Sequence, residues 1–516
     1  MTVRLLADLV RNRGAEVALV DEHGIRSFAE LGERVTRLVN AIRTAGLTAG
    51  STIAVVAGNQ REYFEVMLAC AHAGVTYVPV NWRWVADEIA YVLDDARVEA
   101  VVVDGRYADV VADALDDPRG SKVRLALGVH TDRFESYEEF LASGDPNALA
   151  DQFLGGPMFY TSGTTGRPKG VRSSLTGNGT VPSEIMQLVA ASLSSYVPKD
   201  GRSLLCGPVY HSAQWAFSFF PLINGSSVVM QHHFDAAELC ALIDRYAVTN
   251  VHLVPTQMKR IVDLDDTVRA KFRGESLTAV WHGAAPCPPS VKRSLINWWG
   301  PIVHEYYGST EGAFISTIKA DEWLRKGGSV GRPLEMMEVI VVDDDGQRVG
   351  AGAEGTLYFR NRMGMDFEYH NDPSKTADAH LEPGVFTTGD VGYLDDEGFL
   401  WLSDRKIDMI ISGGVNIYPA EIEGVLAAHP AVLDAAVIGV PDDEWGEAVK
   451  AVVQLRDDVD LAQITPSLTA HCRELLAGYK VPRSFDVADA IPRTATGKIE
   501  KRVLREPYWV GFDRRI

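Results

Sequence analysis

The segment Tyr160-Thr-Ser-Gly-Thr-Thr-Gly-Arg-Pro-Lys-Gly170 is the most informative stretch of this 516-residue sequence. Residues 161–166 are all small or hydroxyl-bearing, so their backbone N–H groups are free to turn inward around an anion. Lys169 adds a positive charge. The segment is not a Walker A loop, because Pro168 precedes the lysine where glycine is required and no Ser or Thr follows it. It therefore predicts a phosphate-binding loop, with a flexible surface loop as the alternative.

On both sides of this segment, helix and strand patterns alternate. Ser27-Phe-Ala-Glu30 is typical of a capping box, and apolar residues at helical spacing follow up to Ile42, before Gly46. Such alternation predicts an α/β fold with a largely parallel sheet. Beyond about residue 330, short strands between Gly- and Asp-rich turns predict a β-rich subdomain. We expect strands at residues 52–57, 98–103, 204–207, 227–230, 251–254, 278–281, 337–343, 355–360, 390–393 and 399–402, and a helix at 62–73.

Composition and charge exclude several classes of protein. Hydrophobic residues make up 46% and charged residues 23%, as in an ordinary globular protein. The net charge of −20 disfavours binding to nucleic acid or to an anionic membrane. No apolar run approaches the roughly 18 residues of a membrane-spanning helix, so we expect no membrane insertion. The five cysteines lack C-x-x-C spacing, which argues against disulfides and a zinc site and favours the cytoplasm.

Further motifs follow in order along the chain, and together with residues 160–170 they resemble the adenylate-forming superfamily of acyl- and aryl-CoA ligases, adenylation domains and luciferases. Tyr306-Tyr-Gly-Ser-Thr-Glu311 is similar to the family's adenine and magnesium segment, and Thr388-Gly-Asp390 to its ribose-binding turn. Asp404-Arg405 with the segment 412–423 resembles its hinge and the first loop of its mobile domain, and residues 492–498 resemble its catalytic-lysine loop.

The resemblance implies roles for particular residues. The catalytic residues implied are Lys498, His211, Glu311 and Thr165, of which Glu311 and Thr165 would hold Mg²⁺. The acyl pocket implied contains His211, Trp215, Thr256, His282 and Tyr306, and Phe217 is a further candidate for its wall. The nucleotide and CoA residues implied are Thr161, Ser162, Gly163, Thr164, Thr165, Gly166, Lys169, Gly283, Ala284, Ala285, Pro286, Tyr307, Gly308, Ser309, Thr310, Asp390, Arg405, Gly413 and Gly414.

The same resemblance implies the domain organisation. A large N-terminal domain would span residues 1–403, made of αβ subdomains and a β-rich subdomain at about 330–403. A hinge would lie at 404–407, and a small, mobile α+β domain at 408–516. Rotation about the hinge would place Lys498 at the active site for acyl-adenylate formation and then replace it with the glycine-rich loop for acyl transfer. Ile407 departs from the Asp or Lys that the family usually has there, which puts the CoA step in doubt.

Two activities are consistent with these motifs. The first is an acid–CoA ligase that uses ATP, Mg²⁺ and CoA, and the second is an amide bond synthetase that transfers the acyl group to an amine. A non-catalytic nucleotide-binding protein would lack Lys498 or Glu311, and both are present. A serine hydrolase is disfavoured, since Gly308-Ser-Thr-Glu-Gly312 has its serine one place too early. We expect a medium-sized or cyclic acid and, from the frequency of such assemblies alone, a homodimer.

Overall fold

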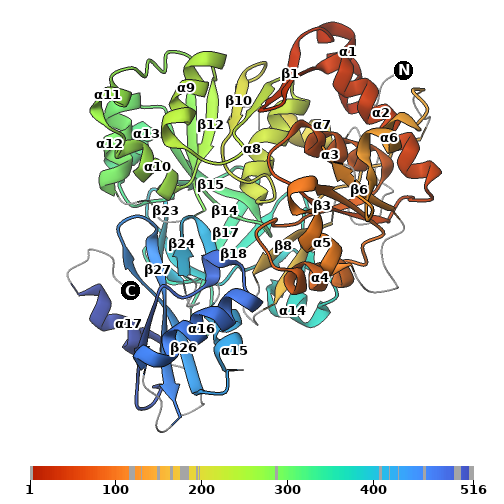
Figure 1. Ribbon diagram of the computed structural model, residues 1–516. Coiled ribbons are helices and arrows are strands. Elements are labelled where there is room, and N and C mark those ends of the chain that lie inside the picture. Colours follow the sequence, from red (N-terminus) through yellow and green to blue (C-terminus); the bar gives the residue numbers. More distant parts are fainter. Residues whose placement is uncertain are drawn as a thin grey trace.

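The computed structural model shows a large α/β domain and a smaller α+β domain that packs against one side of it (Figure 1), as the sequence predicts. The small domain, in blue, lies below the large one. The structure describes residues 4–115, 123–129, 131–147, 151–162, 167–174, 185–192, 196, 198–284, 287, 289–343, 345–405, 410–417, 419–427, 429–456, 461–492 and 501–510.

The first sheet of the large domain is parallel, with strand order β4-β3-β5-β6-β7. The predicted capping box at Ser27 begins α2, since the Ser27 side chain accepts from the Glu30 N–H and the Glu30 side chain accepts from the Ser27 N–H. The strands are β3 (Thr52–Val56), β4 (Thr76–Pro79), β5 (Ala100–Asp104), β6 (Val123–Leu127) and β7 (Glu135–Ser136). The accompanying helices are α2 (Phe28–Thr44), α3 (Arg61–Ala73), α4 (Ala86–Asp95), η1 (Gly105–Tyr107), α5 (Ala108–Ala114) and α6 (Tyr137–Ala142).

The second sheet has nine strands, in the order β16-β15-β14-β13-β12-β10-β11-β1-β2, and its centre is parallel. The strands predicted near residues 204, 227, 251 and 278 form part of this centre. The strands are β1 (Val17–Asp21), β2 (Gly24–Ser27), β10 (Arg202–Leu205), β11 (Ser227–Met230), β12 (Asn250–Leu253), β13 (Ala279–His282), β14 (Val303–Ser309), β15 (Ala313–Ile318) and β16 (Arg332–Pro333). The helices are α1 (Arg4–Arg13), α7 (Ile185–Ser192), α8 (Ser212–Ile223), α9 (Ala236–Tyr246), α10 (Pro255–Val262), α11 (Asp266–Arg269), α12 (Pro289–Trp299) and α13 (Ala320–Arg325).

Antiparallel strands complete the large domain, where the sequence predicts a β-rich subdomain. A six-stranded sheet contains β17 (Met337–Val342), β18 (Gly355–Asn361), β20 (His380–Glu382), β21 (Val385–Phe386), β22 (Asp390–Leu394) and β23 (Leu400–Arg405). A three-stranded sheet contains β8 (Phe159–Ser162), β9 (Pro168–Ser173) and β19 (Phe367–Tyr369), and α14 (Pro373–Asp378) follows it. Since β8 and β9 pair antiparallel, the predicted phosphate loop is the connection of a hairpin.

The small domain has one five-stranded sheet. Its core is rich in Ile and Val side chains, including Ile410, Ile422 and Val437, and Tyr479 packs both against this core and against a core of the large domain. Its strands are β24 (Ile410–Ser412), β25 (Val415–Ile417), β26 (Val432–Asp442), β27 (Gly446–Leu455) and β28 (Ser484–Val487). Its helices are α15 (Pro419–Ala427), α16 (Leu461–Leu475), η2 (Gly478–Lys480) and α17 (Lys501–Trp509).

Two further features bear on the sequence predictions. All five cysteines are free thiols. Within the described part of the chain, no helix combines the length and the apolar character that crossing a bilayer requires.

Candidate active site

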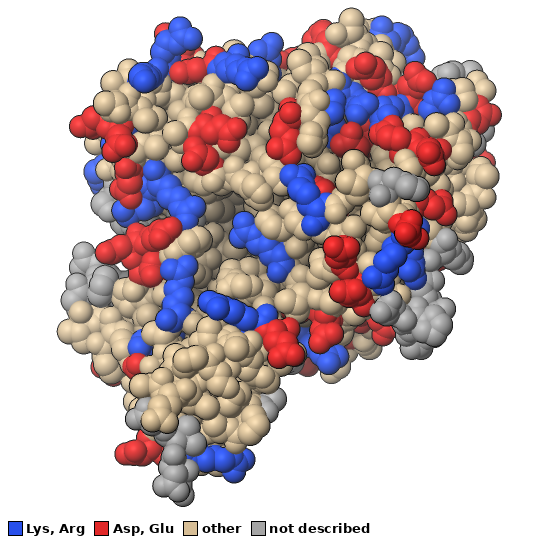
Figure 2. Space-filling view, in the orientation of Figure 1, with Lys and Arg blue, Asp and Glu red and all other residues tan. Residues whose placement is uncertain are grey.

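A cavity of about 840 Å³ lies between the two domains. The ends of parallel strands β10, β12 and β13 open into it, the position where open α/β sheets bind ligands. Figure 2 shows a hollow between the two domains with Lys and Arg side chains along its sides. The predicted site residues that line the cavity are Thr161, Lys169, His211, Trp215, Ala284, Tyr306, Gly308, Ser309, Thr310, Glu311, Asp390, Gly413 and Gly414.

Other predicted site residues cannot be placed in this way. Gly163, Thr164, Thr165, Gly166, Ala285, Pro286 and Lys498 lie outside the described residues, as does Ile407. For Ser162, Thr256 and Arg405 the structure describes the backbone alone.

Lys169, the second residue of β9, lies in the cavity wall. Its Nζ is 2.6 Å from Asp372 Oδ2, an ion pair that ties β9 to the start of α14. The charge of Lys375, which also lines the cavity, adds to that of Lys169. Burial and the neighbouring Lys169 lower the pKa of Lys375. An anion bound beside this pair of lysines would reduce their repulsion, which suits a phosphate group.

Asp390 is held firmly at the start of β22. The side chain is buried and accepts hydrogen bonds from the hydroxyls of Tyr307 (2.5 Å) and Thr388 (2.8 Å). Its backbone pairs with that of Arg405 in the β22–β23 ladder, so Arg405 belongs to a strand of the large domain. Tyr307 differs from its predicted position: it is not among the described residues that line the cavity, and it acts on the site through Asp390.

Glu311 is a carboxylate in the cavity wall. The Tyr369 hydroxyl donates to its Oε1 at 3.1 Å, and burial raises its pKa. A half-buried carboxylate facing a cavity, with Asp390 as a further negative charge nearby, suits a hard divalent cation. The donor chemistry at Glu311 therefore fits Mg²⁺.

His211 precedes α8 and lies beside the cavity. Burial and the positive charge of Arg83 lower its pKa to about 4, so the imidazole is neutral at pH 7. Trp215, one turn into α8, also lines the cavity and stacks on Phe219 with ring centroids 5.2 Å apart. The first turn of α8 thus gives the cavity one neutral polar group and one large apolar surface.

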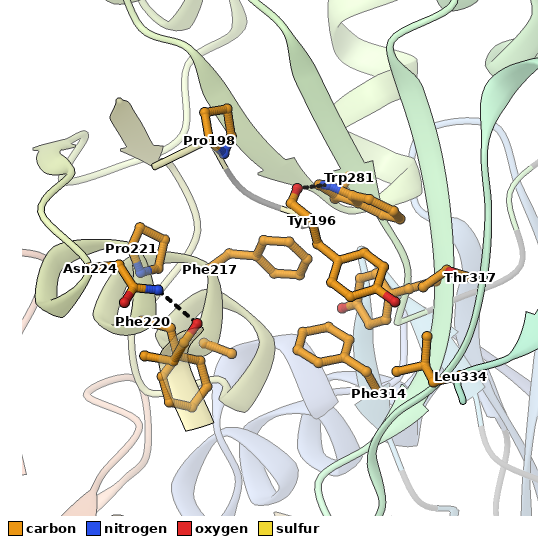
Figure 3. Close-up of a pocket in the computed structure, with 13 residues that line it drawn as sticks. Tyr196, Pro198, Phe217, Phe220, Pro221, Asn224, Trp281, Phe314, Thr317 and Leu334 are labelled. Carbon is orange, nitrogen blue, oxygen red and sulfur yellow. Dashed lines mark hydrogen bonds between the residues drawn. The ribbon is translucent and has the colours of Figure 1, made fainter. Parts of the chain in front are cut away.

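Aromatic side chains close one end of the cavity (Figure 3), where a second, smaller cavity of about 20 Å³ shares Tyr306 and Phe314 with it. Phe217 lies among these rings, 5.5 Å from Tyr306 between centroids. His252, which no motif predicted, also lines the large cavity, and its Nε2 lies 3.0 Å from the Tyr306 hydroxyl, within hydrogen-bond distance. A histidine at the carboxyl end of an apolar strand was the available signal.

His282 is placed differently from its prediction. Its ring is fully buried, 3.6 Å from Glu305, and it is not among the described residues lining either cavity. Gly283 also does not line them; a Cβ there would lie 2.7 Å from the Tyr306 ring, so the glycine lets that ring sit against the backbone. We therefore remove His282 from the acyl pocket and assign Gly283 a packing role.

The small domain contributes a glycine turn to the cavity. Gly413 and Gly414, between β24 and β25, have φ values of 63° and 75°, which favour glycine. A Cβ on Gly414 would lie 2.8 Å from Val254 of the large domain, and one on Gly413 would lie 2.6 Å from Trp445. Arg260 of the large domain lies over the Trp445 ring at 4.7 Å.

A buried ion cluster also joins the two domains. Lys480 Nζ lies within hydrogen-bond distance of Glu88 Oε1 of the large domain, at 2.5 Å, and of Glu421 Oε1, at 2.6 Å. Beside it, the Tyr479 hydroxyl accepts from Asn81 and Trp84. Lys480 is only 1% exposed, so this contact between the two domains is shielded from water.

Polar groups suited to a nucleotide at one side of the cavity, and an aromatic wall at the other, are what an enzyme needs to join ATP to a carboxylic acid. The fold and the site thus define the class of adenylate-forming enzymes. Comparison with known proteins gives the family. Residues 6–366 match the AMP-binding enzyme family and residues 421–498 match the AMP-binding enzyme C-terminal domain, and the chain belongs to this family.

Known relatives include ligases of both kinds considered above. A feruloyl-CoA synthase of Amycolatopsis sp is 34% identical over 93% of this chain and 94% of its own. The amide bond synthetase McbA from Marinactinospora thermotolerans superposes with a TM-score of 0.86 at 30% identity, over 98% of this chain and 100% of its own.

Two structures of one further relative differ in their likeness to this chain. They are of o-succinylbenzoate CoA synthetase (MenE) from Bacillus subtilis, at 27% identity over 98% of both chains. A double mutant bound with the product analogue OSB-NCoA gives a TM-score of 0.83, and the complex with the acyl-adenylate OSB-AMP gives 0.67.

Proposed function

We propose that this enzyme activates a ring-bearing carboxylic acid with ATP and transfers the acyl group to the thiol of CoA. The observation that carries the choice of CoA is Arg83 at the mouth of the cavity. It is exposed, lies 4.8 Å over the Trp82 ring, and has no carboxylate partner among the described residues. Trp82 in turn stacks on Tyr107 at 4.9 Å.

An arginine on an aromatic platform favours an anionic acceptor with a flat ring. CoA carries phosphates and an adenine, whereas an amine is neutral or positively charged and gains nothing from Arg83. The glycine turn at 413–414 also lines the cavity, so the small domain contributes backbone groups where the acceptor would bind. The arrangement of domains is consistent with this step, since the likeness to MenE is greater for the form bound to a CoA product analogue.

The chemistry has two steps. In the first, a carboxylate oxygen attacks the α-phosphorus of ATP, forming the acyl-adenylate and releasing pyrophosphate. In the second, the thiolate sulfur attacks the acyl carbonyl carbon and AMP leaves. Both steps bring negatively charged groups together, so positioning and charge neutralisation dominate catalysis.

We assign the residues as follows. Asp390 and Arg405 hold the ribose, the 161–166 loop with Lys169 holds the phosphates, and Lys498 bridges the carboxylate and the α-phosphate in the first step. Glu311, with Thr165, would hold Mg²⁺, which neutralises phosphate charge when bound. His211, Trp215 and Tyr306 contact the acyl group. The proposed boundaries are 1–403 for the large domain, 404–407 for the hinge and 408–516 for the small domain.

An amide bond synthetase is the second candidate. The TM-score of 0.86 and the 98% coverage with McbA favour it. Arg83 distinguishes the two candidate functions, because a neutral or positively charged amine gains no attraction from its positive charge.

The test measures acceptor use directly. The enzyme, ATP and Mg²⁺ are incubated with aryl acids and either CoA or an amine panel, and products are identified by mass spectrometry. We expect acyl-CoA, and we expect Arg83→Gln to raise the KM for CoA about tenfold while pyrophosphate release without acceptor stays unchanged. Arg37→Gln is the control, because this arginine of α2 does not line the cavity and its side chain contacts Glu33 and the Gly144 carbonyl. Amide formation with CoA ignored would favour the second candidate.

A further inference from the structure

A chain of four hydrogen-bonding groups runs from the backbone of the large domain to the aromatic end of the cavity. The Gly207 N–H donates to Gln214 Oε1 at 3.3 Å. Gln214 Nε2 is 2.9 Å from His252 Nδ1, and His252 Nε2 is 3.0 Å from the Tyr306 hydroxyl. Gln214, His252 and Tyr306 are all buried, at 4%, 1% and 6% exposure.

The direction of donation along this chain is fixed at its first member. A backbone N–H can only donate, so the group facing Gly207 must be the amide oxygen of Gln214. The amide NH₂ then faces His252 Nδ1, and it also lies 3.5 Å from the His252 carbonyl oxygen, a second acceptor. Both contacts require the same amide orientation.

The orientation of Gln214 determines the tautomer of His252. Burial lowers the pKa of His252 to about 3, so the ring is neutral and one nitrogen carries the hydrogen. Since Nδ1 accepts from Gln214, the hydrogen is on Nε2, and Nε2–H donates to the Tyr306 oxygen. The Tyr306 hydroxyl therefore cannot donate to His252.

Tyr306 is left with a hydrogen to donate, and no acceptor for it is found among the described residues. The surroundings of the ring are apolar: Phe217 stacks on His252 at 4.8 Å, and Phe314 lies 4.9 Å from Tyr306. A buried donor without an acceptor costs free energy, and a bound ligand is the group that can relieve it. Tyr306 lines both cavities, so such a ligand reaches it from the acyl side of the active site.

We propose that the acid activated by this enzyme carries a hydrogen-bond acceptor on its ring-bearing part, such as a ketone, ether or phenolic oxygen, which accepts from the Tyr306 hydroxyl. This inference rests on the proposed function and narrows its substrate class. The relay of Gln214 and His252 presents Tyr306 to the substrate as a donor, and the aromatic wall accepts the remainder of the ring. An acid with a purely hydrocarbon tail leaves the donor unsatisfied and is discriminated against.

The test uses pairs of acids that differ in one acceptor. Benzoate, phenylacetate and 3-phenylpropanoate are prepared with a meta- or para-acetyl group and with an isopropenyl group, in which C=CH₂ replaces C=O at nearly the same volume. The kcat/KM for ATP-dependent pyrophosphate release is measured for each. We expect the acetyl acid to be preferred about tenfold in the best-activated pair.

Tyr306→Phe keeps the ring and removes the donor. It is expected to abolish the preference, so that the ratio of kcat/KM for the acetyl acid over its isopropenyl counterpart falls to about one. Thr317→Val is the matched control, because Thr317 contributes another hydroxyl to the smaller cavity (Figure 3); it is expected to change both acids by the same factor. As a readout independent of activity, the infrared carbonyl band of bound ¹³C-labelled acetyl acid shifts to lower frequency in the parent enzyme and not in Tyr306→Phe.

The possible outcomes distinguish a wrong role for Tyr306 from a wrong proposed function. Equal activation of both members of every pair, a preference that survives Tyr306→Phe, or an equal loss for both acids in that variant would overturn the role of Tyr306 while leaving acid activation intact. No pyrophosphate with any acid, from a folded enzyme that binds ATP, would refute the proposed function and this inference with it.

Discussion

Asp390 shows how a single carboxylate is prepared for a ligand. Two hydroxyls, from Tyr307 and Thr388, hold it in one orientation at the cavity wall. A carboxylate held in this way can accept hydrogen bonds from both hydroxyls of a ribose, and it loses little conformational freedom on binding them.

Asp390→Asn therefore changes how the enzyme treats the sugar of ATP. Hydrogen bonds to a charged acceptor contribute about 1.5–3 kcal/mol, so we expect a roughly tenfold or larger rise in the KM for ATP. The preference for ATP over 2′-deoxy-ATP and 3′-deoxy-ATP falls in the variant. Pyrophosphate release with the three nucleotides measures this preference.

Asp395→Asn is the control, because this carboxylate accepts from Trp401 on the adjacent strand and from Lys326 after α13, and does not line the cavity. It is expected to lower stability and to leave the nucleotide preference unchanged. If Asp390→Asn kept the full preference, the ribose role would be wrong.

Several residues singled out by the motifs, such as Lys169, His211 and Glu311, line the cavity, but a motif does not show which of two neighbouring residues faces it. On β14, Tyr306 and Tyr307 are adjacent, and side chains alternate across a strand, so Tyr306 faces the cavity while Tyr307 reaches Asp390. The same alternation on β13 places Trp281 at the smaller cavity and His282 beside Glu305. Which face of each strand lines the cavity depends on how the sheet packs, and the motif alone does not show this.

At the level of the element, the β24–β25 turn is built to approach the large domain closely. Gly414→Ala adds a Cβ that would lie 2.8 Å from Val254, in a backbone conformation that costs roughly 1–2 kcal/mol for other residues. We expect conversion of supplied acyl-adenylate to acyl-CoA to slow at least tenfold and acyl-adenylate formation to continue. Single-turnover assays of the two steps measure the difference.

Gly446→Ala separates strain from contact. Gly446 has a similar φ of 77°, but the nearest atom to its Cβ is the Ile411 oxygen at 3.9 Å, within the small domain. This control is expected to lower the melting temperature as Gly414→Ala does, without the specific loss of acyl transfer. Equal effects of both variants on the two steps would contradict a role for the turn in transfer.

Helices and strands are the part of the structure that the sequence predicts best. The capping box at Ser27 and the apolar strand at residues 227–230 depend on local sequence, and the structure has both as expected. The β23 strand extends to Arg405, into the segment expected to be hinge, because its ladder with β22 continues to Asp390. Pairing of this kind comes from the partner strand, which the local pattern does not show.

For the whole molecule, the buried Lys480 cluster is one of the contacts that join the two domains. Lys480→Met leaves Glu88 and Glu421 buried without their cation, and breaking a buried ion pair in this way costs about 3–5 kcal/mol. We expect this domain arrangement to lose population, so that acyl transfer falls more than tenfold and acyl-adenylate formation persists. Small-angle scattering and assays of the separate steps measure the two effects.

Lys450→Met is the matched control, since it removes an ion pair with Asp486 (2.8 Å) inside the small domain. Unchanged acyl transfer in Lys480→Met would show that the cluster does not hold the domains. No sequence pattern pointed to this contact, because Glu88 and Lys480 are 392 residues apart and meet only after both domains have folded.

Trp445 makes the contact between the two domains accessible to fluorescence measurements. Its indole lies beneath the guanidinium groups of Arg260, at 4.7 Å, and Arg483, at 4.8 Å, and only the first belongs to the large domain. A cation over an indole ring alters the energy of its excited state, so the fluorescence of Trp445 depends on where the small domain lies. Among ten tryptophans, Trp445 is thus an intrinsic optical reporter of the contact between the two domains.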